Sequence, residues 1–263
     1  MPSREQLHKY QDRMINFIYT TPKCALWAGL GLGKTITTLT AIVDLIDSMT
    51  VSKVLIVAPL RVANSVWHKE AANWQHTKHL KFSIVTGSEK ERLASLHKTA
   101  DVYVINRENV HWIVEYYAKK WPFDMIVLDE SSSFKSASSQ RFKSLRKTIP
   151  FTNRLVELTG TPSPNGLLDI WSQMYLLDCG ERLGRSMTAY KQRFFEAGYN
   201  GYSFKPVKSA DRIIHKLIDD IVISLNVDDY LEMPDRIDTV IRVSLPPSRM
   251  VEYKQLEREF LIQ

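Results

Sequence analysis

Cysteine, long apolar runs and low-complexity segments are scarce or absent in this 263-residue sequence. Its two cysteines, Cys24 and Cys179, lie far apart and belong to no CxxC pair or Cys/His ladder, which argues against a disulfide framework and a zinc site. We expect both to be buried, reduced thiols. No run of about 18 apolar residues occurs and the N-terminus is polar and charged, so we expect no membrane span and no signal peptide. The sequence therefore predicts a soluble cytoplasmic protein without membrane contact.

The composition is that of an ordinary globular protein. With 44% hydrophobic and 24% charged residues, the chain can bury the core of one large domain or of two modest domains. The net charge of +6 permits a polyanionic partner such as nucleic acid, although many basic proteins bind none. Charge alone therefore leaves the partner open.

Short apolar runs alternate with longer amphipathic segments along the chain. The runs that predict strands are 24–27, 53–59, 82–85, 101–107, 123–130 and 154–162. The segments that predict helices are 35–46, 61–74, 88–98 and 138–149, and in 61–74 we expect one helix with Val62, Val66 and Trp67 near one face. Nearly continuous apolar strands favour a parallel sheet covered on both faces, as in doubly wound α/β folds. Such sheets bind ligands at the carboxyl ends of their strands.

The stretch "AGLGLGKT" (28–35) follows the first predicted strand and fits most of the phosphate-loop pattern G-x-x-x-x-G-K-[ST]. Ala28 stands at the first glycine position, while Gly33, Lys34 and Thr35 match. In such a loop the lysine reaches the β- and γ-phosphates and the hydroxyl serves Mg²⁺ at a helix N-terminus. The small residues that let backbone N–H groups turn inward are Gly29, Gly31 and Gly33. A glycine turn with a solvated lysine is the alternative.

Two further motifs fall at the ends of later predicted strands. In "MIVLDES" (125–131), Asp129 is suited to hold Mg²⁺, and Glu130 to orient or deprotonate an attacking water. A capped strand-to-helix turn would explain either acid alone. In "LTGTPSPN" (158–165), two threonine hydroxyls flank a glycine that permits a tight turn. The combination of three motifs is more specific than any one of them.

The segments "GLGKT", "VLIVAPLRVANSVWHKEAANW", "VLDESSSFKS" and "LTGTPSPN", in this order, resemble the first RecA-like lobe of Swi/Snf-related DNA translocases in helicase superfamily two, particularly phage and bacterial members. The resemblance implies a RecA-like P-loop α/β fold, a three-layer sandwich with a mainly parallel sheet and a helical C-terminal extension. It places an ATP-binding lobe at 1–180. It assigns 181–263 to a mainly helical extension and linker toward a second RecA-like lobe, which we expect to be absent from this chain.

The resemblance also assigns roles to residues. It implies adenine contact by Gln11, with Tyr10 packing nearby. The implied ATP-binding residues are Gln11, Gly29, Gly31, Gly33, Lys34 and Thr35. The implied Mg²⁺ ligands are Thr35 and Asp129, and the catalytic residues are Lys34, Asp129 and Glu130. The segment that would couple nucleotide state to DNA contact comprises Thr159, Gly160 and Thr161.

Contact with DNA is implied for polar residues after two of the strands. These candidates for phosphate contacts are Arg61, Asn64, Ser65 and Arg107. Phosphate contacts give affinity without sequence preference, so the implied partner is double-stranded DNA of any sequence. Each residue is equally compatible with an ordinary solvated loop. A basic run after the acidic motif is more simply a solvated helix face, although it could border DNA: Lys135, Arg141, Lys143, Arg146 and Lys147.

Two departures from the family pattern are visible. The acidic residues that often precede "GLGKT" in related enzymes are missing here. The acidic motif reads "DESS" instead of "DEAH" or "DEAD", so Ser131 and Ser132 leave open how this motif communicates with the third. Trp67, Trp74, Trp112 and Trp121 are expected to serve packing.

The sequence therefore predicts the Mg-ATP-binding half of a DNA-dependent ATPase that moves on DNA, weakly active in isolation and located in a bacterial or phage-infected host cytoplasm. The arginine finger and the other half of the DNA track would come from a second lobe, on a longer polypeptide or another chain. A strand-separating helicase and a non-catalytic nucleic-acid-binding module are the alternatives.

Overall fold

The computed structural model describes residues 1–198, 203–226, 230 and 246–260. Met1–Tyr230 form one compact unit, and the second unit, Leu231–Gln263, contains helix α11 (Pro247–Phe260). Among the described residues, no helix combines the length and the apolar character needed to cross a bilayer.

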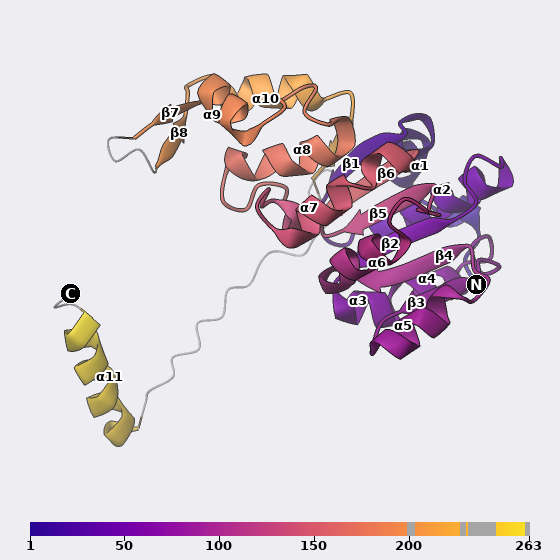
Figure 1. The fold of residues 1–263 in the computed structure, drawn as a ribbon, viewed down its shortest axis with the longest axis horizontal. Helices are drawn as coiled ribbons and strands as arrows, with labels where there is room; N and C mark the ends of the chain where they lie inside the picture. Colours follow the sequence, from indigo (N-terminus) through magenta and orange to yellow (C-terminus); the bar gives the residue numbers. More distant parts are fainter. Residues whose placement is uncertain (199–202, 227–229, 231–245, 261–263) are drawn as a thin grey trace. The chain divides into compact units, whose positions relative to one another are not determined.

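The first unit is built around a seven-stranded sheet in the order β3-β4-β2-β5-β6-β1-β9, in which every neighbouring pair is parallel (Figure 1). The strands are β1 (Lys23–Ala28), β2 (Val54–Ala58), β3 (Phe82–Val85), β4 (Val102–Asn106), β5 (Met125–Asp129), β6 (Arg154–Thr159) and β9 (Val222–Leu225). The first six confirm the strands predicted from the sequence. All residues of β2, β4 and β6 are buried, which explains the continuous apolar run of β2 and the largely apolar run of β4.

Helices cover both faces of this sheet (Figure 1). They are α1 (Lys9–Thr20), α2 (Lys34–Asp47), α3 (Leu60–Ser65), α4 (Trp67–Asn73), α5 (Glu89–Leu96), α6 (Val110–Tyr117), α7 (Gln140–Arg146), α8 (Ile170–Asp178), α9 (Met187–Phe194) and α10 (Ala210–Ile218). Alternate strand residues such as Ala25 and Trp27 share one core with side chains of α6 to α10. Cys24 and Leu26 point to the opposite face, where α1 packs against α2. The α/β sandwich expected from the sequence is therefore present.

The segment 61–74 does not form the single helix that we expected. It folds as α3 and α4, which are separated by a break at Val66 with φ −100° and ψ −60°. Val66 is 38% exposed, whereas Trp67 is fully buried. Neither glycine nor proline marks this break, so the apolar pattern alone could not locate it.

The segment after residue 180 contains the predicted helices and also strands that were not predicted. Strands β7 (Phe195–Ala197) and β8 (Phe204–Pro206) form an antiparallel pair. Strand β9 joins the main sheet beside β1, with Ala25 opposite Val222. Strands β7 and β8 have only three residues each, and the apolar run of β9 lies in a segment that we expected to be mainly helical. The domain boundary at residue 180 stays a prediction, but the sheet takes one strand from beyond it.

The two cysteines differ in environment. Cys24 is buried in β1, and burial raises the pKa of its thiol to about 12. Cys179 is exposed, which corrects the expectation that both are buried. It ends α8 in the left-handed conformation, with φ 57°, and this turn directs the residue outward from the helix terminus.

Candidate functional site

The glycine stretch forms a tight loop between β1 and α2. Gly31 and Gly33 adopt positive φ angles of 85° and 71°, a region that favours glycine. A Cβ atom on Gly33 would lie 2.2 Å from Nε2 of Gln11, so a side chain has no room there. The ammonium of Lys34 folds back over the loop and donates to the carbonyl oxygens of Ala28 (2.6 Å) and Gly29 (3.0 Å).

Helix α2 begins at Lys34, so the loop leads directly into a helix N-terminus. Thr35, the second residue of this helix, is half-buried. The first backbone N–H groups of a helix carry partial positive charge and favour anions. Gly29, Gly31, Gly33 and Lys34 occupy the positions that a phosphate cradle requires. Their contact with nucleotide remains a prediction.

Gln11 lies beside this loop although it comes from α1. Its side chain is 5% exposed, and its Oε1 accepts a hydrogen bond of 2.8 Å from the backbone N–H of His8. Its Nε2 faces Gly33. The neighbouring Tyr10 ring stacks on His8 with a centroid distance of 5.2 Å. The structure thus brings the expected base-contacting glutamine next to the phosphate loop.

Asp129 ends β5 in a buried environment. Burial raises the pKa of its carboxyl group, and the hydrogen bond from Nε1 of Trp67 to Oδ2 (3.0 Å) opposes that rise. The Lys34 ammonium also opposes it. Burial in turn lowers the pKa of Lys34, and the charges of Asp129 and Glu130 oppose this shift. The lysine and the two acids therefore lie within electrostatic reach of one another.

Glu130 has a left-handed backbone, with φ 59° and ψ 61°, which is rare for a residue with a side chain. Strain of this kind costs on the order of 1–3 kcal/mol and tends to occur at functional sites. The carboxyl Oε1 accepts hydrogen bonds from the hydroxyls of Ser132 (2.8 Å) and Thr159 (2.9 Å). Two hydroxyl donors therefore fix the orientation of this carboxylate.

The third motif contacts both other motifs. Oγ1 of Thr159 accepts the backbone N–H of Thr161 at 3.0 Å while its hydroxyl donates to Glu130. A Cβ atom on Gly160 would lie 3.4 Å from the carbonyl oxygen of Ala28, so this glycine packs on the start of the phosphate loop. The contact from Glu130 to Thr159 is a direct connection between the acidic motif and the third motif.

These three motifs meet because β5, β6 and β1 are neighbours in the sheet and end at the same edge. The sequence identified the motifs but missed two partners. Trp67 was expected only to pack, yet it donates a hydrogen bond to Asp129. Ser132 was recognised only as a departure from the family pattern, yet it holds Glu130. No local signal distinguishes a packing indole from one that also donates.

The residues expected to contact DNA lie at the carboxyl ends of other strands. Arg61, Asn64 and Ser65 belong to α3, after β2. Asn64 Oδ1 accepts the hydroxyl of Thr86, which follows β3, at 2.7 Å. Arg107 follows β4 and donates to the adjacent Glu108 at 3.0 Å. The structure gathers these residues along one part of the sheet edge, and their role in binding DNA stays a prediction.

The basic run after the acidic motif has partners within the chain. Lys135 lies 3.6 Å from Asp169, and the guanidinium of Arg146 lies 5.9 Å from the ring centroid of Tyr175. Lys143 and Lys147 are exposed. These contacts agree with a helix face exposed to solvent, and they leave open whether the face borders DNA.

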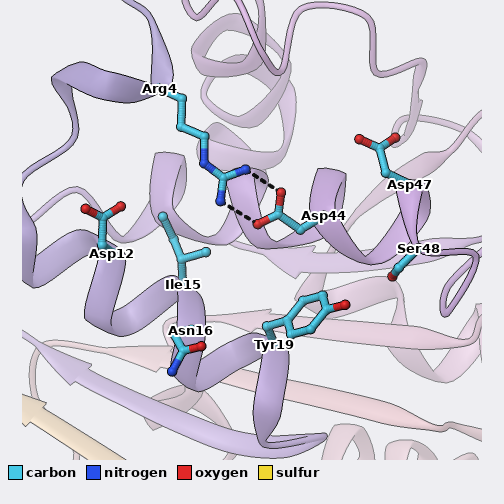
Figure 2. Close-up of a pocket in the computed structure, with 8 residues that line it drawn as sticks. All are labelled: Arg4, Asp12, Ile15, Asn16, Tyr19, Asp44, Asp47 and Ser48. Carbon is cyan, nitrogen blue, oxygen red and sulfur yellow. Dashed lines mark hydrogen bonds and ion pairs between the residues drawn. The ribbon is translucent and has the colours of Figure 1, made fainter.

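A pocket of about 530 Å³ between α1 and α2 lies away from the glycine loop (Figure 2). Its charged side chains are Arg4, Asp12, Asp44 and Asp47. Arg4 forms a paired contact with Asp44 through hydrogen bonds of 2.5 and 2.7 Å. The remaining acids repel phosphate, and Asp44 and Asp47 lie at the end of α2 opposite Lys34. This pocket is therefore unsuited to a nucleotide.

The fold and the three converging motifs define a RecA-like nucleotide-binding lobe. Residues 10–262 match the SNF2-related domain, and the chain belongs to this family. It is homologous to part of the ATPase core of SNF2-type DNA-dependent ATPases and translocases.

Two relatives illustrate the range of the family. Protein p41 of Acyrthosiphon pisum secondary endosymbiont phage 1 is 37% identical over 97% of this chain and 58% of its own length. The DNA excision repair protein ERCC-6-like of Mus musculus is 30% identical over 70% of this chain and 16% of its own length. The chain thus spans little more than half of the phage relative and a small part of the mouse protein.

The solved SWI2/SNF2 ATPase core of Sulfolobus solfataricus in complex with dsDNA has the same fold. It superimposes with a TM-score of 0.69 at 22% sequence identity, over 95% of this chain and 51% of that chain. A second solved structure, of the Sulfolobus solfataricus SWI2/SNF2 ATPase core domain, gives a TM-score of 0.64. This chain therefore corresponds to about half of that ATPase core.

Proposed function

We propose that this chain is the nucleotide-binding lobe of a DNA-dependent ATPase that moves along duplex DNA. The observation that supports the proposal best is the convergence of Lys34, Asp129 and Glu130 at the ends of β1 and β5, the two strands that flank β6. The pKa shifts of Lys34 and Asp129 both include the charges of the other residues in this group. A phosphoryl-transfer site needs this combination of one cation and two acids with different roles.

The residues fit Mg-ATP. The loop glycines and the N-terminus of α2 present N–H groups to phosphates, and Lys34 exchanges its carbonyl partners for phosphate oxygens. Thr35 and Asp129 are the two protein oxygen ligands that we assign to Mg²⁺, a number that suits a cation bound mainly by phosphates and water. Bound Mg²⁺ would neutralise the negative charge of the β- and γ-phosphates. Gln11 supplies an amide beside the loop for the adenine.

Glu130 carries the hydrolytic step in this proposal. Its carboxylate orients a water molecule and accepts a proton while the water oxygen bonds to the γ-phosphorus and the bond to the bridging oxygen breaks. Ser132 and Thr159 hold the carboxylate in one orientation. Thr159 also accepts the backbone N–H of Thr161. A movement of Glu130 on the γ-phosphate side would therefore be transmitted to the third motif through Thr159.

Movement on DNA requires a second lobe, and we assign that lobe to another part of the full-length protein or to a second chain. This chain covers 51% of the Sulfolobus core that was solved with dsDNA, which supports a two-lobed assembly. Nonspecific duplex DNA is the partner that we propose, with contacts through Arg61, Asn64, Ser65 and Arg107. The site of action would be a bacterial or phage-infected host cytoplasm.

Calorimetric titration of Mg-ATP tests the nucleotide site. We expect binding in the micromolar to millimolar range, weakened at least tenfold (about 1.4 kcal/mol) by Lys34→Ala because the lysine charge is lost. Lys78→Ala, a substitution of an exposed lysine, serves as the matched control and should leave the affinity unchanged. Equal binding by Lys34→Ala would contradict the phosphate role of this loop.

Movement on DNA is tested with the full-length protein. We expect ATP hydrolysis to be stimulated by duplex DNA and a third DNA strand to be displaced from a triplex as the protein advances. Separation of the two strands of the duplex itself would contradict movement along intact duplex DNA and would favour a strand-separating helicase.

A further inference from the structure

Three polar side chains are buried together beneath the acidic motif. Ser131, Glu157 and Gln173 are each 0% exposed, and they come from a 3-10 turn (Ser131–Phe134), from β6 and from α8. Buried polar groups are costly unless hydrogen bonds satisfy them. No role assigned above requires these three residues.

Gln173 uses both ends of its amide to bridge two functional segments. Its Oε1 accepts the hydroxyl of Ser131 at 2.8 Å, directly after Glu130 in the chain. Its Nε2 donates to the carbonyl oxygen of Pro162 at 2.7 Å, directly after Thr161, and to that of Asp169 at 3.0 Å. One side chain on α8 therefore binds both the acidic motif and the third-motif loop.

Glu157 is the third member of this buried cluster. Burial raises the pKa of its carboxyl group well above its usual range, and the nearby Ser131 hydroxyl opposes this shift. The Ser131 hydroxyl donates to Gln173, and neither carboxyl oxygen of Glu157 has a hydrogen-bond partner among the described residues.

We propose that Gln173 is a positioning residue that holds the acidic motif and the third-motif loop in a fixed relative position through Ser131 and Pro162. This connection runs parallel to the direct contact between Glu130 and Thr159. Two connections constrain the relative orientation of the segments more tightly than one. The inference rests on the proposed ATPase function, because it assigns Gln173 to the orientation of Glu130 during hydrolysis.

The test compares Ser131→Ala, Gln173→Met and the double variant in the full-length protein. We expect DNA-stimulated kcat to fall roughly three- to tenfold in each single variant, as for loss of one buried hydrogen bond, with KM for ATP unchanged. The double variant should fall no further than Gln173→Met alone, because that substitution already removes the contact with Ser131. Additive losses, an unchanged kcat or a change confined to KM would overturn the proposal.

Ser133→Ala is the matched control. It removes a hydroxyl from the same 3-10 turn, and the Oγ of Ser133 has no hydrogen-bond partner among the described residues. We expect wild-type kcat and KM from this variant. A loss of kcat equal to that of Ser131→Ala would mean that the turn is merely sensitive to substitution, and the proposal would fail.

Amide hydrogen exchange without nucleotide separates this inference from the proposed function. We expect faster exchange in residues 160–166 of Ser131→Ala and Gln173→Met, with α2 and the Ser133→Ala control unchanged. Unaltered exchange in 160–166 would overturn the bridge even in a protein that hydrolyses ATP. Absence of Mg-ATP binding by the wild-type protein would contradict the proposed function, while the exchange measurement would still decide whether the bridge exists.

Discussion

The carboxyl edge of the sheet has two halves that differ in how they hold their polar residues. Where β5, β6 and β1 end, the functional side chains bind residues from other strands and helices, as Glu130 does with Thr159 and Asp129 with Trp67. Where β2, β4 and β3 end, the residues expected to contact DNA bind neighbours within the same half, as Arg107 does with Glu108 and Asn64 with Thr86. We call these the central half and the peripheral half.

The difference reflects what each half is proposed to do. Orienting a water molecule requires a carboxylate held in one position, which a buried network provides. Attracting the phosphates of DNA requires positive charge at the surface, and flexible exposed side chains suffice for that. Substitutions in the central half should therefore affect catalysis and stability strongly, whereas those in the peripheral half should affect DNA affinity modestly.

The largest expected effect is on the rate of hydrolysis. Glu130→Gln should lower the DNA-stimulated kcat of the full-length protein roughly 10²- to 10⁴-fold, because the amide cannot accept the proton. Mg-ATP affinity should persist. Glu108→Gln in the peripheral half is the control, and it should leave kcat unchanged in the same steady-state assay. If Glu130→Gln lowered kcat only a few-fold, Glu130 would not be the residue that accepts the proton during hydrolysis.

The next largest effect should be on the free energy of unfolding, and it should differ between the buried Arg154 and the half-buried Arg107. Arg154, 6% exposed at the start of β6, donates to the carbonyl oxygens of Ile18 and Tyr19 at the end of α1, both at 2.6 Å. Arg154→Met should destabilise the protein by about 2–4 kcal/mol in urea denaturation, because two carbonyl groups lose a charged donor. Arg107→Met should change stability by less than about 0.5 kcal/mol. Equal effects would contradict the expectation that a buried, hydrogen-bonded arginine contributes more to stability than Arg107 does.

The dependence of stability on pH should also distinguish the central half. The folded state raises the pKa of Glu157 above the ordinary value of 4.5, so the unfolded state releases this proton first as the pH rises. Wild-type stability is therefore lost with rising pH between 4.5 and the folded pKa, by up to about 1.4 kcal/mol per pH unit.

Glu157→Gln removes this titration and should gain stability relative to wild type in urea denaturation as the pH rises above 4.5. Glu108→Gln is the control from the peripheral half, where hydrogen bonds from Asn106 and Arg107 lower the pKa and the sign reverses. A difference between Glu157→Gln and wild type that does not grow with pH would contradict a neutral buried carboxyl group.

The smallest expected effect is on DNA binding. Arg107→Ala should weaken the affinity of the full-length protein for duplex DNA severalfold in fluorescence anisotropy and reduce the salt slope by about 1, as for loss of one phosphate contact. Mg-ATP binding should not change. An unaltered salt slope would mean that Arg107 makes no contact with a DNA phosphate.

The sequence was sufficient for features that depend on regular patterns. Apolar runs located six strands, and the three motifs identified Lys34, Asp129 and Glu130 as neighbours, because parallel strands bring their ends to one edge. The family model and the structural comparison confirm the fold class and the family. The ATP and DNA roles of individual residues stay predictions.

Features that depend on three-dimensional packing could not be obtained in this way. The apolar run of β9 lies in a segment that reads as mainly helical, and neither glycine nor proline marks the break at Val66. Cys179 is exposed and ends α8 in the left-handed conformation, and the apolar pattern of the sequence did not predict this exposure. The bridge through Gln173 joins segments that are distant in the sequence and that only the fold brings together. The sequence alone therefore gives no sign of it.

Strand β1 lies between β6 and β9, and both of these neighbours come much later in the chain. A ribosome therefore releases the phosphate loop early, yet the strand that supports it acquires its second hydrogen-bonded neighbour only after Leu225 has emerged. Until then β1 has an open edge, which is a hazard for aggregation during synthesis. A recombinant fragment that stops at residue 180 would keep that edge open permanently, so a chain extending beyond β9 is the better choice for expression.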